Sequence, residues 1–298
     1  MTAALTTRII DGLAREVRRE VAAYAEMLGK EAAALGVLFY GSNLRTGSLE
    51  GVLDFYILLP GPQRDRIWPR VSYREWSCDG QKLRAKIATM SLEQFELAAA
   101  GQSRDTTIWT RFVQPSALAW GRDDLARAAI AAAVESAAKT AARLASALGP
   151  EMGSAEDYWR ALFRATYQAE FRIEKAGRED SILEVNKAHF EGLLPLAWDA
   201  GGISFTREGD QFTTIMPAAS RKQILGWWRA RARMGKLLNL LRLAKATTTF
   251  DGAADYAAWK LHRHTGIALA VTPFRAKHPL LAAPGAALEL WRKRRAQR

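Results

Sequence analysis

One carboxylate stands in an otherwise apolar stretch of the sequence. Asp54 lies near the start of residues 52–59, a run with the length and the flanking residues of a buried strand. A buried carboxylate is costly unless it is hydrogen-bonded, paired with a cation or bound to a metal. Asp54 is therefore the first candidate for a residue that takes part in chemistry.

A Gly-Ser pair precedes this acid. Gly41 and Ser42 end the apolar run 37–40, and eleven residues separate Ser42 from Asp54. Glycine lets the backbone approach a phosphate closely, and the free N–H groups of a following helix attract anionic oxygen. A carboxylate can hold Mg²⁺ against the same phosphate group. These residue types suit a phosphate group and Mg²⁺, whereas a plain turn between two strands is the alternative for the Gly-Ser pair alone.

This arrangement resembles the nucleotidyltransferase fold of the DNA polymerase β superfamily. Its motif is an apolar strand, Gly-Ser, about a dozen residues and an acid on the next strand, as in Gly41, Ser42 and Asp54. Most members carry a second acid two residues after the first, where this sequence has Tyr56. The resemblance implies metal-assisted transfer of a nucleotidyl group.

A closer resemblance is to the mitochondrial-type CDP-diacylglycerol synthases, the phosphatidate cytidylyltransferases, which also lack the second acid. Residues 40–42 and 53–55 resemble the core of that family, and residues 84–87 stand where it has a basic strand with a lysine. Residues 124–132 look like the start of its next helix. Residues 167–172 are similar to its Tyr-x-x-Asp-x-Arg segment, with Glu170 in place of the aspartate.

This family joins CTP to phosphatidate with Mg²⁺, releasing pyrophosphate, so the resemblance implies CTP and a phosphorylated acceptor as partners. It implies catalytic roles for Asp54, Lys86 and Glu170 and metal binding by Asp54 and Glu170. The nucleotide would be bound by Tyr40, Gly41, Ser42, Arg84 and Arg172. Lys86 as a bystander on a strand edge is the alternative for that residue.

The charge balance points to a polyanionic partner. The net charge is +12 and the pI is about 10.0, values that fit nucleic acid, an anionic membrane surface or a phosphorylated substrate. Residues 221–245 carry eight Lys and Arg and no acid, and residues 284–298 combine apolar residues with a basic cluster. Both fit a basic amphipathic helix on an anionic membrane. For the first, a packed helix with a solvated basic face is the alternative; for the second, charges that complement a helix C-terminus.

Two other functions are compatible with the same motif. The first is a different nucleotidyltransferase, acting on nucleic acid or a small molecule, with residues 221–245 on a phosphate backbone. Nucleic acid is the less favoured partner, because Trp227 and Trp228 are the one aromatic pair among these basic residues. The second is a non-catalytic nucleotidyltransferase-like module, because Tyr56 removes one carboxylate.

The pattern of elements predicts an α+β protein. We expect a nucleotidyltransferase-like mixed sheet with helices over residues 1–122, a mostly helical domain over 123–283 and a basic amphipathic helix over 284–298. One helix is expected over residues 5–35 and an extended segment over 108–120.

Smaller features follow from local signals. Residues 83–90 are expected to form a strand, and Ser91 to cap the helix that follows. Residues 125–148 form an expected helix, Ser154 and Asp157 an expected capping pair, and residues 203–215 an expected hairpin.

The cellular compartment is indicated by features that the sequence lacks. Cys78 is the one cysteine, so no intramolecular disulfide can form, and a reducing compartment is expected. No apolar run reaches the roughly 18 residues that spanning a bilayer requires, and no signal-peptide core is visible. We therefore expect a cytoplasmic protein, peripheral on the inner face of a membrane.

Overall fold

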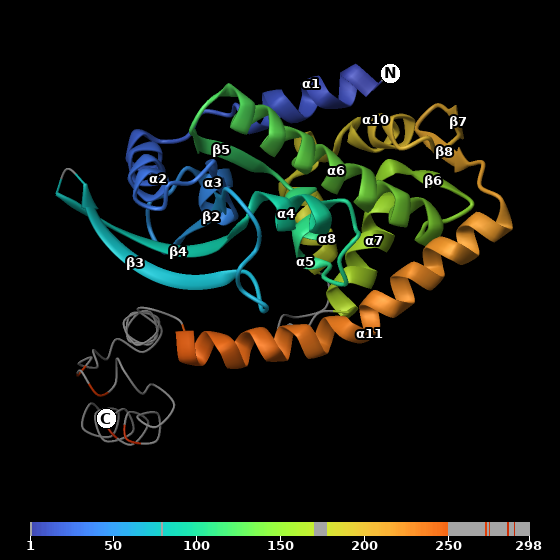
Figure 1. The fold of residues 1–298 in the computed structure, drawn as a ribbon. Helices are drawn as coiled ribbons and strands as arrows, with labels where there is room; N and C mark the ends of the chain where they lie inside the picture. The colour runs from blue at the N-terminus through green and yellow to red at the C-terminus, as the bar shows by residue number, and fades with distance from the viewer. Residues whose placement is uncertain are drawn as a thin grey trace, which may run out of the picture.

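The computed structural model describes residues 2–78, 80–169 and 178–249, together with the isolated residues 272, 274, 285 and 289. The protein is α+β, as the sequence predicts, with a mixed sheet followed by a largely helical part (Figure 1). The expected helix at 284–298 lies almost entirely outside the described residues.

The main sheet has five strands in the order β3-β4-β2-β1-β5. Strand β2 runs parallel to β4, and the other neighbouring pairs are antiparallel. Both apolar runs beside the motif are strands, as predicted, and so is the segment 83–90. The bounds are β1 Gly36–Tyr40, β2 Leu53–Leu59, β3 Arg70–Cys78, β4 Gln81–Ser91 and β5 Ser116–Gly121.

Both faces of the two central strands are covered. Leu38, Tyr56 and Leu58 belong to the large core shared with the helical part, whereas Val37 and Phe55 face a smaller core under helix α2 (Arg19–Glu31). A strand covered on both faces needs apolar residues at nearly every position. This explains why the runs around the motif are continuous rather than alternating.

The prediction of one helix over residues 5–35 is wrong. The chain forms α1 (Thr2–Leu13) and α2, with a break at residues 14–18. Leu5 and Ile9 of α1 pack into the large core, and Val21 of α2 packs into the smaller one. The break lets two short amphipathic helices cover two different cores, which a single straight helix does not reach.

The prediction of an extended segment over residues 108–120 is wrong in its first half. Thr107–Phe112 form helix α5, and only β5 is extended. The side chain of Asp105 accepts hydrogen bonds from the backbone N–H of Thr107 at 3.1 Å and from its hydroxyl at 2.7 Å, which fixes the turn just before the helix. Pro115 then disfavours helical backbone at the residue before it and separates α5 from β5.

Both predicted capping signals are confirmed. The Ser91 hydroxyl accepts from the N–H of Gln94 at the start of α4 (Leu92–Ala99). The structure adds a cap that was not predicted, Asp123, whose side chain accepts from the N–H of Ala126 at the start of α6 (Asp124–Leu148). Ser154 and Asp157 form the expected reciprocal pair, with N–H to side-chain distances of 2.9 and 3.2 Å, at the start of α7 (Ala155–Ala169).

The remaining elements complete the helical part. The predicted hairpin is present, turns at Gly209, and joins a three-stranded sheet in the order β6-β8-β7. The bounds are α3 Ser42–Thr46, β6 Met152–Ser154, α8 Arg178–Val185, α9 Lys187–Phe190, α10 Leu193–Ala200, β7 Phe205–Glu208, β8 Gln211–Thr214 and α11 Ala218–Thr249. The large core draws residues from both sides of residue 122, and the domain boundary there stays a prediction.

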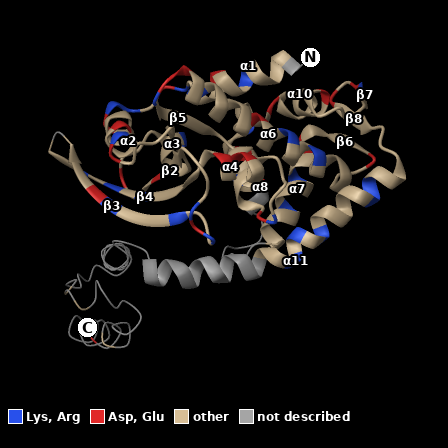
Figure 2. Cartoon of the chain, viewed as in Figure 1, with Lys and Arg blue, Asp and Glu red and all other residues tan. Residues whose placement is uncertain are grey.

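Helix α11 packs its apolar side on the protein. Ile224 and Trp228 are buried, and the ring of Trp109 lies 6.1 Å from that of Trp228. Lys222 and Arg229 are exposed, whereas Arg221 and Arg231 donate to backbone carbonyl oxygens of Ala147 and Ser103. Basic residues recur along the described part of this helix (Figure 2). The described side chains of α11 therefore follow the packed-helix alternative. Among the described residues, no helix is long and apolar enough to cross a membrane.

Candidate functional site

Asp54 lies at the centre of a three-strand register. Its Cα is paired with Tyr40 on β1 and with Lys86 on β4, so the three side chains share one face of the sheet. Asp54 opens into a pocket of about 300 Å³. The pocket is lined by Tyr40, Gly41, Ser42, Arg45, Asp54, Arg111, Gln114, Pro115, Tyr167, Ser181, Ile182 and Val185.

Gly41 forms the tight turn between β1 and α3. Its φ is +89°, a conformation that side chains disfavour, and a Cβ placed there would lie 2.9 Å from Oδ2 of Asp54. The glycine therefore lets the chain turn directly over the carboxylate. This brings Ser42 and Asp54, twelve positions apart, into one pocket.

The loop after the Gly-Ser pair is held by Asn43. Its buried side-chain amide donates to the carbonyl oxygens of Ser48 and Glu50, both at 2.8 Å. Ser42 and Arg45 are exposed at the pocket, and a separation of three positions puts them on one side of the short helix. The guanidinium of Arg45 makes no hydrogen bond or ion pair with the described residues.

The electrostatics of the pocket centre on Asp54. Burial raises the pKa of its carboxyl group, and the positive charges of Lys86 and Arg111 oppose that rise. The guanidinium carbon of Arg111 also lies 5.3 Å from the ring centre of Tyr40. Burial raises the pKa of Tyr40 to about 12, so its phenol stays neutral near pH 7. The carboxylate thus faces two cations and a neutral hydroxyl.

The opposite wall of the pocket comes from the helical part. Tyr167 near the end of α7 lines it, together with Ser181, Ile182 and Val185 from α8. Glu170 and Arg172 follow Tyr167 closely but lie outside the described residues, so their predicted roles stay predictions. Tyr167 brings the start of their segment to the same pocket as Asp54.

The two basic residues of β4 have different surroundings. Lys86 is paired with Asp54 in the sheet register, and its positive charge lowers the pKa of that carboxyl group. The Nε of Arg84 lies 3.3 Å from a carboxylate oxygen of Glu75 on β3, and Arg84 is not among the residues that line the pocket. Tyr40, Gly41, Ser42 and Asp54 therefore line one pocket. Lys86 is not in the lining but is paired with Asp54 in the sheet register, and Arg84 forms an ion pair with Glu75.

The oxygen-bearing side chains of the pocket suit one divalent cation whose other ligands are phosphate oxygens. Asp54 is its one carboxylate among the described residues, and no three described His, Cys, Asp or Glu side chains gather into a metal cluster. Mg²⁺ is commonly held by one or two carboxylates plus phosphate oxygens and water. A desolvated carboxylate with a raised pKa is stabilised by such a cation. The site would therefore suit Mg²⁺, with Asp54 as the protein ligand.

Tyr56 lies two residues after Asp54, on the same face of β2. It is fully buried, and its ring centre lies 5.3 Å from that of Phe112 and 6.0 Å from that of Phe95. The next inward-facing residue of β2 is therefore part of an aromatic core. Strand β2 supplies a single carboxylate to the pocket.

Sequence reasoning missed Arg111, Arg45 and Gln114. Arg111 was hidden because residues 108–120 were expected to be extended, whereas α5 turns it toward Tyr40 and Asp54. Arg45 carries a local signal, since it lies one helical turn after Ser42. Gln114 carries none, because its place depends on how α5 and β5 meet. In the comparisons with known proteins, no family model matches the sequence and no curated protein is significantly similar to it.

Proposed function

We propose that this protein is a Mg²⁺-dependent nucleotidyltransferase that joins CTP to a phosphate-bearing acceptor, with phosphatidate as the acceptor. The observation that carries the proposal is the convergence of Gly41, Ser42 and Asp54 in one pocket with Lys86 and Arg111 beside the carboxylate. The resemblance of residues 40–55 to the phosphatidate cytidylyltransferases supplies the choice of CTP and phosphatidate.

The reaction needs no strong general base. An oxygen of the acceptor phosphate, already an anion, attacks the α-phosphorus of CTP; the new P–O bond forms as the bond to the β-phosphate oxygen breaks, and pyrophosphate leaves. Bound Mg²⁺ supplies neutralisation of phosphate charge. Catalysis is then mostly positioning and electrostatic stabilisation. Positively charged and hydroxyl-bearing side chains are the groups such chemistry uses.

The residues of the site have roles that fit their surroundings. Gly41 lets the backbone approach the triphosphate, and Ser42 donates its hydroxyl to a phosphate oxygen. Arg45 and Arg111 offer guanidinium groups for phosphate oxygens. Lys86 offsets the charge of Asp54 and of the leaving group, and Asp54 holds the metal.

The test is a pyrophosphate-release assay with purified protein, Mg²⁺ and each nucleoside triphosphate. We expect release with CTP that depends on phosphatidate in mixed micelles and is lost in Asp54→Asn. Release with RNA or an aminoglycoside, and none with phosphatidate, would assign a different acceptor. No release with any acceptor, despite CTP binding, would assign a binding module.

We also propose a cytoplasmic location, peripheral on the inner face of an anionic membrane. Support comes from the net charge of +12 and from the exposed Lys222, Arg229 and Arg233 on α11. Residues 284–298 combine apolar residues with a basic cluster in the sequence, and we assign insertion into lipid to this segment. Vesicle sedimentation of the full chain and of residues 1–283 checks this, and equal pelleting of the two would contradict it. Salt should weaken binding, because exposed charges are screened within about 8 Å at physiological ionic strength.

A further inference from the structure

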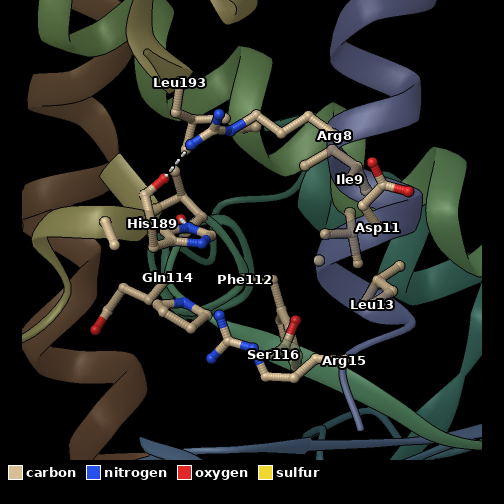
Figure 3. Close-up of a pocket in the computed structure, with 16 residues that line it drawn as sticks. Arg8, Ile9, Asp11, Leu13, Arg15, Phe112, Gln114, Ser116, His189 and Leu193 are labelled. Carbon is tan, nitrogen blue, oxygen red and sulfur yellow. Dashed lines mark hydrogen bonds between the residues drawn. The ribbon is translucent and has the colours of Figure 1, made fainter. Parts of the chain in front are cut away.

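A second pocket lies between the end of α1, the segment 112–116 and α9 (Figure 3). Its volume is about 250 Å³, and its floor is apolar, with Leu13, Phe112 and Val134 among the lining residues. The polar residues that line it are Arg8, Asp11, Arg15, Gln114, Ser116 and His189. None of these six has an assigned role in the proposed transferase reaction, although Gln114 also lines the pocket of Asp54.

Two arginines flank this pocket. Arg8 extends from α1 across it, and its Nη2 donates to the carbonyl oxygens of His189 at 2.9 Å and Glu191 at 2.5 Å (Figure 3). Arg15 approaches from the opposite side, toward Gln114 and Ser116. The guanidinium of Arg15 makes no hydrogen bond or ion pair with any residue that the structure describes. One cation is therefore held in place and the other is available.

The protonation of His189 reflects its burial and the positive charge around the pocket. Its Nε2 lies 2.9 Å from the carbonyl oxygen of Val113, so this nitrogen carries the proton and donates it. The pKa of His189 is lowered to about 4, chiefly by burial; the charges of Arg8 and Arg15 add to this lowering, and the hydrogen bond to Val113 opposes it. The ring is neutral near pH 7, and the charged groups that act on it are both positive. Asp11, the one carboxylate of the lining, is exposed at the rim.

We propose that this pocket binds a small organic anion, an apolar body that carries a carboxylate or phosphate group. The anionic group pairs with Arg15 and lies in the positive field of Arg8, and the hydroxyl of Ser116 is within the same lining. The apolar body packs on Leu13, Phe112 and Val134. A pocket with an apolar floor and a few convergent polar groups is the usual form of a small-molecule site.

The pocket is separate from the proposed catalytic one. The two share Gln114 and Pro115 as a common wall, but Asp54, Ser42 and Arg45 line only the first. The anion site therefore does not depend on the proposed function, and variants in one pocket leave the polar groups of the other in place.

Benzoate and its neutral isostere benzamide test the proposal, with binding followed by calorimetry or by NMR titration of the full chain. We expect benzoate to bind at least tenfold more tightly than benzamide. Arg15→Gln should weaken benzoate binding at least tenfold and leave benzamide unchanged. Arg66→Gln, at an exposed arginine outside both pockets, is the matched control and should bind as the wild type does.

Two further variants locate the site. Ala188 is exposed on α9 and lines the pocket, so Ala188→Phe should block benzoate binding without removing any charge. Arg45→Gln, in the other pocket, should bind benzoate normally. Equal affinity for benzoate and benzamide, full binding by Arg15→Gln or Ala188→Phe, or loss of binding in Arg45→Gln would each overturn the proposal.

Discussion

The backbone of Gly41 approaches Asp54 so closely that an added Cβ would lie 2.9 Å from its Oδ2 atom. The φ of +89° at the same residue independently disfavours any side chain. Gly41, which joins β1 to α3, is therefore required to be glycine for two separate reasons, its backbone conformation and the lack of space for a side chain.

Gly41→Ala should lower nucleotidyl transfer about 100-fold, because the methyl group displaces the carboxylate or the turn, and misplacement by about 1 Å can cost that much. Gly47 is the matched control: its φ is +65°, but nothing lies within 4 Å of an added Cβ. Gly47→Ala should cost about 1 kcal/mol of stability from backbone strain and retain activity. Transfer rates and thermal unfolding of both variants check this, and equal rates would refute it.

Asp54→Asn should stabilise the protein while abolishing transfer. The folded pKa of Asp54 is raised above its unfolded value by burial, so the group favours folding at low pH and loses that contribution as pH rises through the raised pKa. Near pH 7 the wild type carries a desolvated charge that the variant lacks. Unfolding midpoints from pH 4 to 8 should therefore show a stability gain that grows with pH. A variant less stable than the wild type at pH 8 would contradict this.

Lys86→Met should lower transfer about 100-fold and raise the pKa of Asp54 further, because Lys86 is the first of the cations that oppose the rise. The acid limb of the pH–rate profile should move to higher pH. Lys82 on the same strand is exposed and paired with Glu75 instead, so Lys82→Met serves as the control. An unchanged profile in Lys86→Met would remove the lysine from the site.

Those parts of the fold that depend on neighbouring residues were predictable. The strand–Gly-Ser–strand unit, the Ser91 and Ser154 caps and the hairpin at Gly209 each rest on residues within a few positions of one another. The register that sets Asp54 beside Lys86 was not predictable, because it depends on which strands pair across the sheet.

The wrong predictions, at residues 108–112 and 14–18, concern segments whose structure depends on contacts with residues far away in the sequence. Residues 108–112 are apolar and β-branched enough to suggest a strand, but Trp109 and Phe112 are buried against helices, and that packing favours α5. Arg111 is 57 positions from Asp54, so the sequence holds no local sign that the two share a pocket. The break at residues 14–18 is likewise set by two cores that exist only in the folded chain.

His189→Gln should reduce the fall in the free energy of unfolding that occurs as the pH is lowered. The folded pKa of His189 is about 4, below its unfolded value of 6.5, so the neutral ring contributes stability above pH 6.5 that is lost as pH falls toward 4. The loss is up to about 3 kcal/mol at pH 4, and Gln does not titrate. The difference in unfolding free energy between the two proteins, measured from pH 4 to 7, checks this; a difference independent of pH would refute it.

Tyr56 makes it costly to add a second carboxylate to β2. Its ring fills the core between Phe95 and Phe112, so Tyr56→Asp leaves a cavity costing about 3–5 kcal/mol and buries a charge at further expense. That sum approaches the whole stability of an ordinary domain, about 5–15 kcal/mol. A single substitution therefore cannot introduce a second acid here; the aromatic neighbours must be replaced with it. An engineer who wants a two-metal site should therefore begin on another strand.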